Sequence, residues 1–184
     1  MSKTALINID TQCSFFHRDY WEDTHFMAFS ERLTALIAGC VARQIPVVDI
    51  FHVADEGAFS LASGFVAPMP FLTHRPAVSF QKHVHNAFTD TGLDHWLRQR
   101  DIRHLIIAGI RTEQCCETTA RVASDLGYQV TFVSEATLTF PMTWQDITLD
   151  CPTLHHRTEM VLTGRFATIQ TVDACLANLP EKQE

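Results

Sequence analysis

Apolar residues in this chain gather in short runs that alternate with segments of helical period. The runs are rich in β-branched and aliphatic residues, as buried strands are, and lie at 4–9, 45–53, 77–80, 104–110, 128–133 and 166–171. Between them, apolar positions recur with the spacing of amphipathic helices over 30–44, 89–100, 113–127, 153–165 and 172–179. Strands that alternate with helices indicate βαβ units, because parallel strands need a long crossover connection.

This alternation predicts the fold class. We expect a single α/β domain over residues 1–184, a three-layer, Rossmann-like fold with a mostly parallel six-stranded sheet and helices on both faces. Ser30 is a suitable N-cap for the first helix, and Gly127 is a suitable stop for the helix at 113–127. The stretch 54–76 has three prolines, two glycines and little period, so we expect a long connection of the kind that often carries function.

Composition narrows the classes of partner. The chain has 184 residues, 46% of them hydrophobic, and a net charge of −7 without a run of lysine or arginine. Proteins that bind nucleic acid or anionic membranes carry a basic surface, so we expect a small-molecule substrate, no nucleic acid and no membrane. The first residues lack the pattern of a secretory signal, and no apolar run is long enough to span a bilayer. These features favour a cytoplasmic protein.

The six cysteines are expected to be reduced thiols, because the chain shows no export signal and is long enough to fold without disulfides. Their spacing is not that of zinc sites, and the adjacent Cys115 and Cys116 cannot easily both reach one tetrahedral ion. The sequence therefore predicts no metal and no other cofactor.

Reactive side chains follow several of the predicted strands. Asp10 follows the first strand, His52 lies near the end of the second, Lys82 follows the third, and Cys115 and Cys116 follow the fourth. Because ligands of parallel sheets bind at the carboxyl ends of the strands, we expect these side chains to converge on one edge. A thiol nucleophile needs a base and benefits from a nearby cation, and Asp10 and Lys82 supply both. A position in the first turn of a helix is expected to lower the pKa of Cys115.

Three segments together carry a resemblance to a known family. They read LINIDTQCSFF, KHVHNAFTDTGL and LIIAGIRTEQCCETTARVASDLGYQV, in this order across residues 5–133. In this combination the chain resembles the isochorismatase-like cysteine hydrolases, which include nicotinamidases, N-carbamoylsarcosine amidases and ureidoacrylate hydrolases. The terminal strand and helix also fit, so the resemblance covers nearly the whole chain.

The resemblance implies a catalytic triad and a reaction. The family's aspartate matches Asp10, its lysine Lys82 and its nucleophile Cys115. The resemblance also implies a cis peptide before Arg111, an oxyanion hole from the backbone N–H groups of Arg111 and Cys115, and a packing role for Cys116. The implied reaction hydrolyses an amide or ureido C–N bond through a thioester. Members that cleave the vinyl ether of isochorismate generally lack the cysteine, so Cys115 favours an amide-like substrate.

The resemblance further suggests a homo-oligomer, dimeric or tetrameric, and leaves the substrate pocket loosely defined. We expect Phe16, His17, His52 and Phe88 to line it. Metal-dependent nicotinamidases of this family carry an Asp-x-His element, whereas the nearest segment here, DIFH, places Asp49 and His52 one residue further apart. This spacing argues against a metal-bearing nicotinamidase.

Two other interpretations of the cysteine segment stay open. Cys115 and Arg121 have the C-x5-R spacing of cysteine phosphatases, in which the arginine and a loop of backbone amides bind phosphate. The intervening residues lack glycine and continue a helical pattern, which argues against such a loop. The other interpretation is a non-catalytic domain that binds a small molecule or uses Cys115 and Cys116 as a redox pair.

Overall fold

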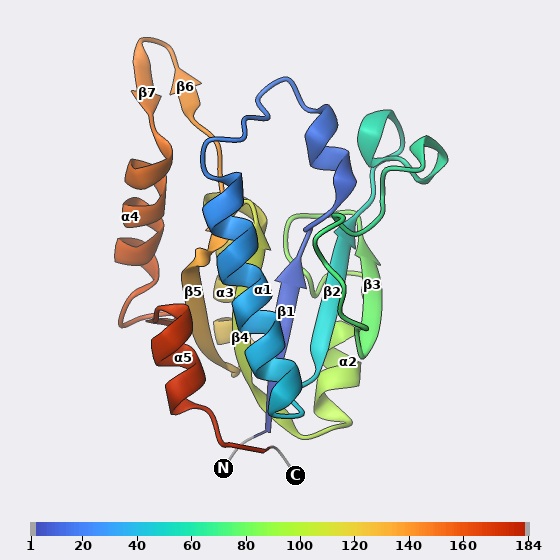
Figure 1. Ribbon diagram of the computed structural model, residues 1–184, viewed down its shortest axis with the longest axis vertical. Coiled ribbons are helices and arrows are strands. Elements are labelled where there is room, and N and C mark those ends of the chain that lie inside the picture. The colour runs from blue at the N-terminus through green and yellow to red at the C-terminus, as the bar shows by residue number, and fades with distance from the viewer. Residues whose placement is uncertain (1–2, 183–184) are drawn as a thin grey trace.

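The sheet predicted from the sequence is present. A computed structural model describes residues 3–182 and shows six parallel strands in the order β3-β2-β1-β4-β5-β8 (Figure 1). The strands are β1 (Lys3–Ile9), β2 (Val47–His52), β3 (Val78–Lys82), β4 (Ile102–Ile110), β5 (Gln129–Leu138) and β8 (Thr168–Ile169). The α/β fold class is confirmed, with strand ends that differ from the predicted ones by a few residues.

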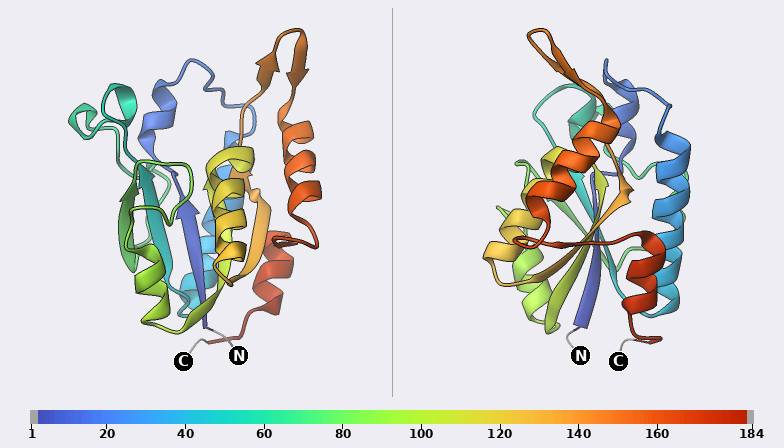
Figure 2. Two further views of the ribbon diagram at one scale, coloured as in Figure 1. Left: turned by 180° about the vertical axis from the view of Figure 1, so that it is seen from behind. Right: turned by 90° about the vertical axis from the view of Figure 1, so that its left-hand side faces the viewer.

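Helices cover both faces of this sheet (Figure 2). One face carries α1 (Phe26–Ala42) and α5 (Val172–Asn178), and the other carries α2 (Leu93–Arg98), α3 (Glu117–Asp125) and α4 (Cys151–Leu162). Successive side chains of a strand point to opposite faces. In β1, Leu6 therefore packs in the cluster that contains Leu33 of α1, and Ile7 packs in the cluster that contains Ala120 of α3. Burial on both faces explains why the strand sequences are almost continuously apolar.

The first helix begins earlier than predicted. α1 starts at Phe26, and Ser30 lies inside it with its hydroxyl donating to the Met27 carbonyl oxygen at 2.9 Å, so the N-cap prediction was wrong. Aromatic packing accounts for the added turn, because the rings of Phe26 and Phe29 lie 5.8 and 6.1 Å from that of Phe71. Such a contact between distant segments outweighs the local preference for a capping residue.

An antiparallel hairpin that the sequence analysis missed projects beyond the sheet (Figure 1). It consists of β6 (Met142–Trp144) and β7 (Ile147–Leu149), paired as two short strands outside the main sheet. The pairing places Thr143 opposite Thr148, whose hydroxyls are 2.8 Å apart. The apolar side chains of both strands alternate with this pair and are exposed. Strands of this length carry too few positions for their alternation to be recognised in a sequence.

The connection 54–76 has only two 3-10 turns, η2 (Gly57–Phe59) and η3 (Leu61–Ser63), as its regular structure. A further 3-10 turn, η1 (Cys13–His17), follows β1. Among the described residues, no helix is both long enough and apolar enough to cross a membrane. All six cysteines are free thiols.

Gly109 lets the two central strands approach closely at their carboxyl ends. Its φ is +124°, and a Cβ atom built at this position would lie 2.0 Å from the Ile9 carbonyl oxygen. The pairing of β4 with β5 also shifts register between Ile107 and Gly109. Only glycine avoids both the steric overlap and the conformational penalty of a positive φ. The spacing between the ends of β1 and β4 therefore depends on this residue.

We expect Gly109→Ala to lower the free energy of unfolding by at least about 3 kcal/mol or to prevent folding, because the methyl group must displace backbone atoms. The matched control is Gly127→Ala, where φ is +88° and nothing lies within 4 Å of the added Cβ. That variant should lose only about 1 to 2 kcal/mol, the conformational cost alone. Urea denaturation measures both losses, and equal losses would contradict the steric role of Gly109.

Candidate active site

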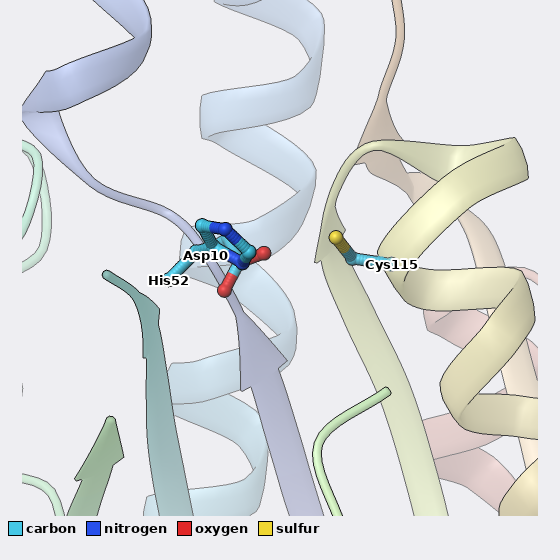
Figure 3. A group of neighbouring side chains, drawn as sticks. All are labelled: Asp10, His52 and Cys115. Atoms are coloured by element: carbon cyan, nitrogen blue, oxygen red, sulfur yellow. The ribbon is translucent and has the colours of Figure 1, made fainter. Parts of the chain in front are cut away.

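Four reactive side chains meet at the carboxyl edge of the sheet. Asp10 comes directly after β1, His52 is the last residue of β2, and Lys82 is the last residue of β3. Cys115 lies in η4 (Thr112–Cys116), a π-helical turn between β4 and α3. Figure 3 shows Asp10, His52 and Cys115 approaching one another from these three places. The convergence expected from the order of the strands is present.

The Lys82 ammonium group connects the others. Its Nζ lies 2.8 Å from Asp10 Oδ2, 3.4 Å from Cys115 Sγ and 3.0 Å from His52 Nδ1, and it also donates to the Val84 carbonyl oxygen at 3.1 Å. An ammonium group has three hydrogens, so these four acceptors share them. Lys82 is fully buried and Asp10 is 1% exposed, so the ion pair lies away from solvent.

Backbone contacts hold the ends of β1 and β2 in place. Asp10 has a φ of +50°, a region that aspartate tolerates better than most residues, and its N–H donates to the Ile50 carbonyl oxygen at 2.8 Å. The Gln12 side chain pairs with the backbone of His52 in both directions, accepting from its N–H at 2.7 Å and donating to its carbonyl oxygen at 3.0 Å. Gln12 therefore fixes the position of the His52 backbone relative to the turn that follows Asp10.

Burial and the ion pair control the protonation of the site. Burial raises the pKa of Asp10, although the Lys82 charge works in the opposite direction. For Lys82, burial is opposed by the charges of Asp10 and Cys115, which together raise its pKa. The pKa of Cys115 is raised to about 12, first by burial and then by the Asp10 carboxylate. The prediction that the helix start lowers this pKa was therefore wrong, because burial outweighs the local dipole. At neutral pH the thiol keeps its proton beside a carboxylate of increased proton affinity.

His52 is neutral at neutral pH. Burial lowers its pKa to about 4, and the charge of Lys82 adds to this effect. Lysine has no acceptor, so the 3.0 Å contact requires His52 Nδ1 to accept a hydrogen bond from Lys82. This assigns the remaining proton of the ring to Nε2.

A pocket of about 600 Å³, including part of its open mouth, lies over the reactive group. Asp10, His52 and Cys115 line it, while the buried Lys82 supports them from within the protein. Its other lining residues come from η1 and the chain after it, from the connection 54–76, and from the segments around β3 and η4: Phe15, Arg18, Tyr20, Ala54, Glu56, Ala58, Phe59, His85, Arg111 and Gln114.

Of the four residues expected in the pocket, the structure brings only His52 to it. Phe16 packs against Trp21, with ring centroids 4.6 Å apart, and His17 stacks on Phe65 at 3.7 Å. Phe88 stacks on Tyr128 at 5.8 Å, on the face of the sheet covered by α3. These three residues contact aromatic neighbours that the sequence pattern did not identify, and His17 remains exposed.

The residues that take their place come from irregular segments. Arg18 and Tyr20 follow η1, Phe59 ends η2, and the Arg18 guanidinium carbon lies 5.0 Å from the centre of the Phe59 ring. No periodicity marks a residue in a turn, so none of these positions had a signal in the sequence. Phe15, directly before the predicted Phe16, lines the pocket in place of Phe16.

Arg111 has the backbone geometry that the resemblance implied. The Ile110–Arg111 peptide bond is cis. The guanidinium group of Arg111 is buried. It donates to the Phe140 carbonyl oxygen at 3.1 Å and pairs with the Glu113 carboxylate at 3.1 Å. These contacts hold the side chain, and the Arg111 carbonyl oxygen accepts from the Cys116 N–H at 3.2 Å.

Comparison with known proteins agrees with this geometry. The family model named Isochorismatase domain matches residues 4–165. The chain belongs to the isochorismatase family. It is 30% identical over 176 residues to the uncharacterized isochorismatase family protein YrdC of Bacillus subtilis (strain 168), a match that covers 93% of each chain.

Two further relatives of this isochorismatase-family hydrolase are informative. Nicotinamidase 3 of Arabidopsis thaliana is 36% identical over 74 residues, which cover 40% of this chain and 37% of the relative. The crystal structure of a candidate isochorismatase from Burkholderia xenovorans LB400 superimposes with a TM-score of 0.88 at 25% identity, covering 96% of this chain and 88% of that one.

The structure separates the two adjacent cysteines of this family member. Cys116 is fully buried in the cluster beneath α3, whereas Cys115 lines the pocket. Arg121 is a residue of α3 and pairs with Glu117, four residues earlier, at 2.9 Å. The segment between Cys115 and Arg121 is helical, so it cannot form the open phosphate-binding loop of a cysteine phosphatase.

The ligand atoms of Asp10, His52 and Cys115 all lie within 4.8 Å of one another, a separation that a metal ion could span. Lys82 Nζ contacts all three residues, so a positive charge already lies among them. Asp49, which the DIFH segment placed near His52, instead accepts hydrogen bonds from Asn8 at 2.9 Å and from His74 at 3.1 Å. Asp49 and His52 therefore have different partners.

The lowered pKa of His52 predicts a pH dependence of stability. The unfolded chain takes up a proton at His52 below about pH 6.5, but the folded protein does so only near pH 4. The stabilisation is therefore complete above pH 6.5 and lost as the pH falls toward 4, by about 1 to 2 kcal/mol after allowance for solvent screening of the partly exposed ring. Comparing the unfolding free energy of wild type and His52→Asn across this range isolates the contribution, since asparagine keeps an acceptor for Lys82. If wild type and His52→Asn lose stability equally as the pH falls, His52 makes no such contribution.

Proposed function

We propose that this isochorismatase-family hydrolase cleaves an amide or ureido C–N bond of a small molecule through a thioester on Cys115. The observation that carries the proposal is the contact of one buried ammonium group, Lys82 Nζ, with both the Asp10 carboxylate and the Cys115 thiol. A base, a cation and a nucleophile at hydrogen-bonding distance form the arrangement that covalent catalysis by a thiol requires.

In the first step, Asp10 takes the proton of the Cys115 thiol as sulfur attacks the carbonyl carbon. The raised pKa of both groups supports a transfer that is concerted with attack, because free thiolate is scarce at neutral pH. Lys82 remains charged throughout and stabilises the negative charge on Asp10 and, during attack, the charge that passes through sulfur to the carbonyl oxygen.

The carbonyl oxygen becomes negative in the tetrahedral intermediate. The backbone N–H groups of Arg111 and Cys115 are the proposed donors to this oxygen. One such donor typically lowers the activation barrier by about 3 to 4 kcal/mol. When the C–N bond breaks, Asp10 returns its proton to the leaving nitrogen. Water then attacks the thioester carbon, Asp10 accepts a water proton, and the C–S bond breaks as that proton returns to sulfur.

The pocket supports a small polar substrate with a flat or apolar part. Phe15, Tyr20 and Phe59 supply aromatic walls, whereas Arg18 and Glu56 place charges of both signs among the lining residues. Nicotinamidase 3, the relative that matches part of this chain, is named for an amide substrate. An amide-type C–N bond is therefore the proposed target.

Cys115→Ser should lower hydrolysis by at least about 10³-fold, because the residue acts as nucleophile in a concerted group. Ammonia release from a panel of primary amides, ureido acids and nicotinamide identifies a substrate and measures this loss. Cys116→Val is the matched control, since it replaces the neighbouring, fully buried thiol with a side chain of similar size. It should keep most of the activity, and the reverse pattern would reject Cys115 as the nucleophile.

Asp10→Asn should change how the rate depends on pH. Without the base, only ionised Cys115 can attack, so the residual rate should rise about tenfold per pH unit from pH 7 until the thiol titrates. Wild type, in which Asp10 takes the proton, should vary much less over this range. Profiles of the same shape for both proteins, measured by ammonia release from the substrate found above, would exclude Asp10 as the base.

A further inference from the structure

A second group of metal-ligating side chains lies outside the active-site pocket. The ligand atoms of Glu22, His25 and Cys151 are all within 4.8 Å of one another. None of the three lines the pocket over Asp10 and Cys115. The proposed hydrolysis uses none of them, so their proximity calls for a separate explanation.

Two segments far apart in the sequence bring these residues together. Glu22 and His25 lie at the end of the chain segment before α1, where His25 occupies the N-cap position. Cys151 is the first residue of α4. His25 and Cys151 also line one groove between these two helix starts, together with His155, four residues further along α4. The three residues therefore connect the helix layers on the two faces of the sheet, next to the place where the hairpin β6–β7 leads into α4.

The chemistry of the three donors is specific. A thiol, an imidazole and a carboxylate form the mixed sulfur, nitrogen and oxygen set that binds Zn²⁺. Cys151 Sγ lies 4.0 Å from Glu22 Oε1, and bonds of about 2.3 Å to sulfur and 2.0 Å to oxygen would bring these atoms to about 3.5 Å in a tetrahedral site. The required contraction between these two atoms is about half an ångström, which rotation of the partly exposed Glu22 side chain can supply.

The surroundings of Cys151 favour a cation. Cys151 is 3% exposed, so its sulfur has few alternative positions, and its thiol donates to the Thr139 carbonyl oxygen at 3.3 Å. Glu22 Oε1 lies 4.0 Å from this sulfur, and the carboxylate of Asp150 belongs to the adjacent residue, so negative charge lies beside the thiol. A divalent ion would reduce this excess of negative charge and would release the thiol proton to solvent on binding.

We propose that Glu22, His25 and Cys151 form a binding site for Zn²⁺ or a similar thiophilic divalent cation, with water as the fourth ligand. Occupation would tie the segment before α1 to the start of α4. That segment begins with Arg18 and Tyr20, which line the active-site pocket, so the ion would steady one wall of the pocket without taking part in the reaction. The proposal does not depend on the substrate or on the hydrolytic mechanism.

Cobalt titration of the metal-free full-length protein tests this site. Co²⁺ substitutes for Zn²⁺, and a thiolate ligand gives a charge-transfer band in the near ultraviolet. We expect this band in wild type, its loss in Cys151→Ser, and at least about a tenfold weaker affinity in His25→Ala and Glu22→Gln. Zn²⁺ should displace Co²⁺ and raise the melting temperature of wild type in a concentration-dependent way.

Two control variants separate this site from other histidines and thiols. Cys115→Ser should keep the band, because the active-site group Asp10, His52 and Cys115 is the competing location. His156→Ala should also keep it, because His156 is exposed on α4 and lies 4.0 Å from Glu159. If the band is absent in wild type, or is lost in Cys115→Ser but kept in Cys151→Ser, the proposed site is rejected. His25→Ala alters an exposed side chain, so its result holds even if Cys151→Ser fails to fold.

Discussion

The reactive edge of this protein depends on one buried ammonium group. Lys82 Nζ contacts the carboxylate of Asp10, the thiol of Cys115 and the Nδ1 atom of His52, and these residues come from the ends of different elements. A buried lysine without such partners would lose its charge. The ion pair is thus both a structural link between β1 and β3 and the electrostatic centre of the site.

The sheet makes this link possible because it is buried on both faces. Parallel strands covered by helices are rigid, and their carboxyl ends meet along one edge. Gly109 allows β4 to approach β1 closely there, and Gln12 ties the end of β2 to the turn after β1. The reacting groups are therefore supported by backbone contacts of the core, whereas the pocket walls come from turns and long connections, which can vary without disturbing the core.

Burial also decides how a thiol can react in this site. A helix start alone would favour thiolate, but the low polarity around Cys115 raises its pKa to about 12. Cys115 is consequently a neutral thiol beside a carboxylate that burial makes more basic. In the proposed reaction, such an arrangement makes the carboxylate, rather than the helix dipole, responsible for activating the thiol.

The sequence by itself determined the α/β class, the parallel sheet and the residues Asp10, Lys82 and Cys115, because apolar periodicity and the order of the strands are local properties that place strand ends on one edge. It did not determine the start of α1, the hairpin β6–β7, the walls of the pocket or the protonation of Cys115. Each of these depends on contacts between distant segments: Phe26 on Phe71, Phe59 on Arg18, and the thiol on the burial that the whole fold produces. Only the tertiary structure brings such segments together, and so only it decides which aromatic side chains line the pocket and how a cysteine holds its proton.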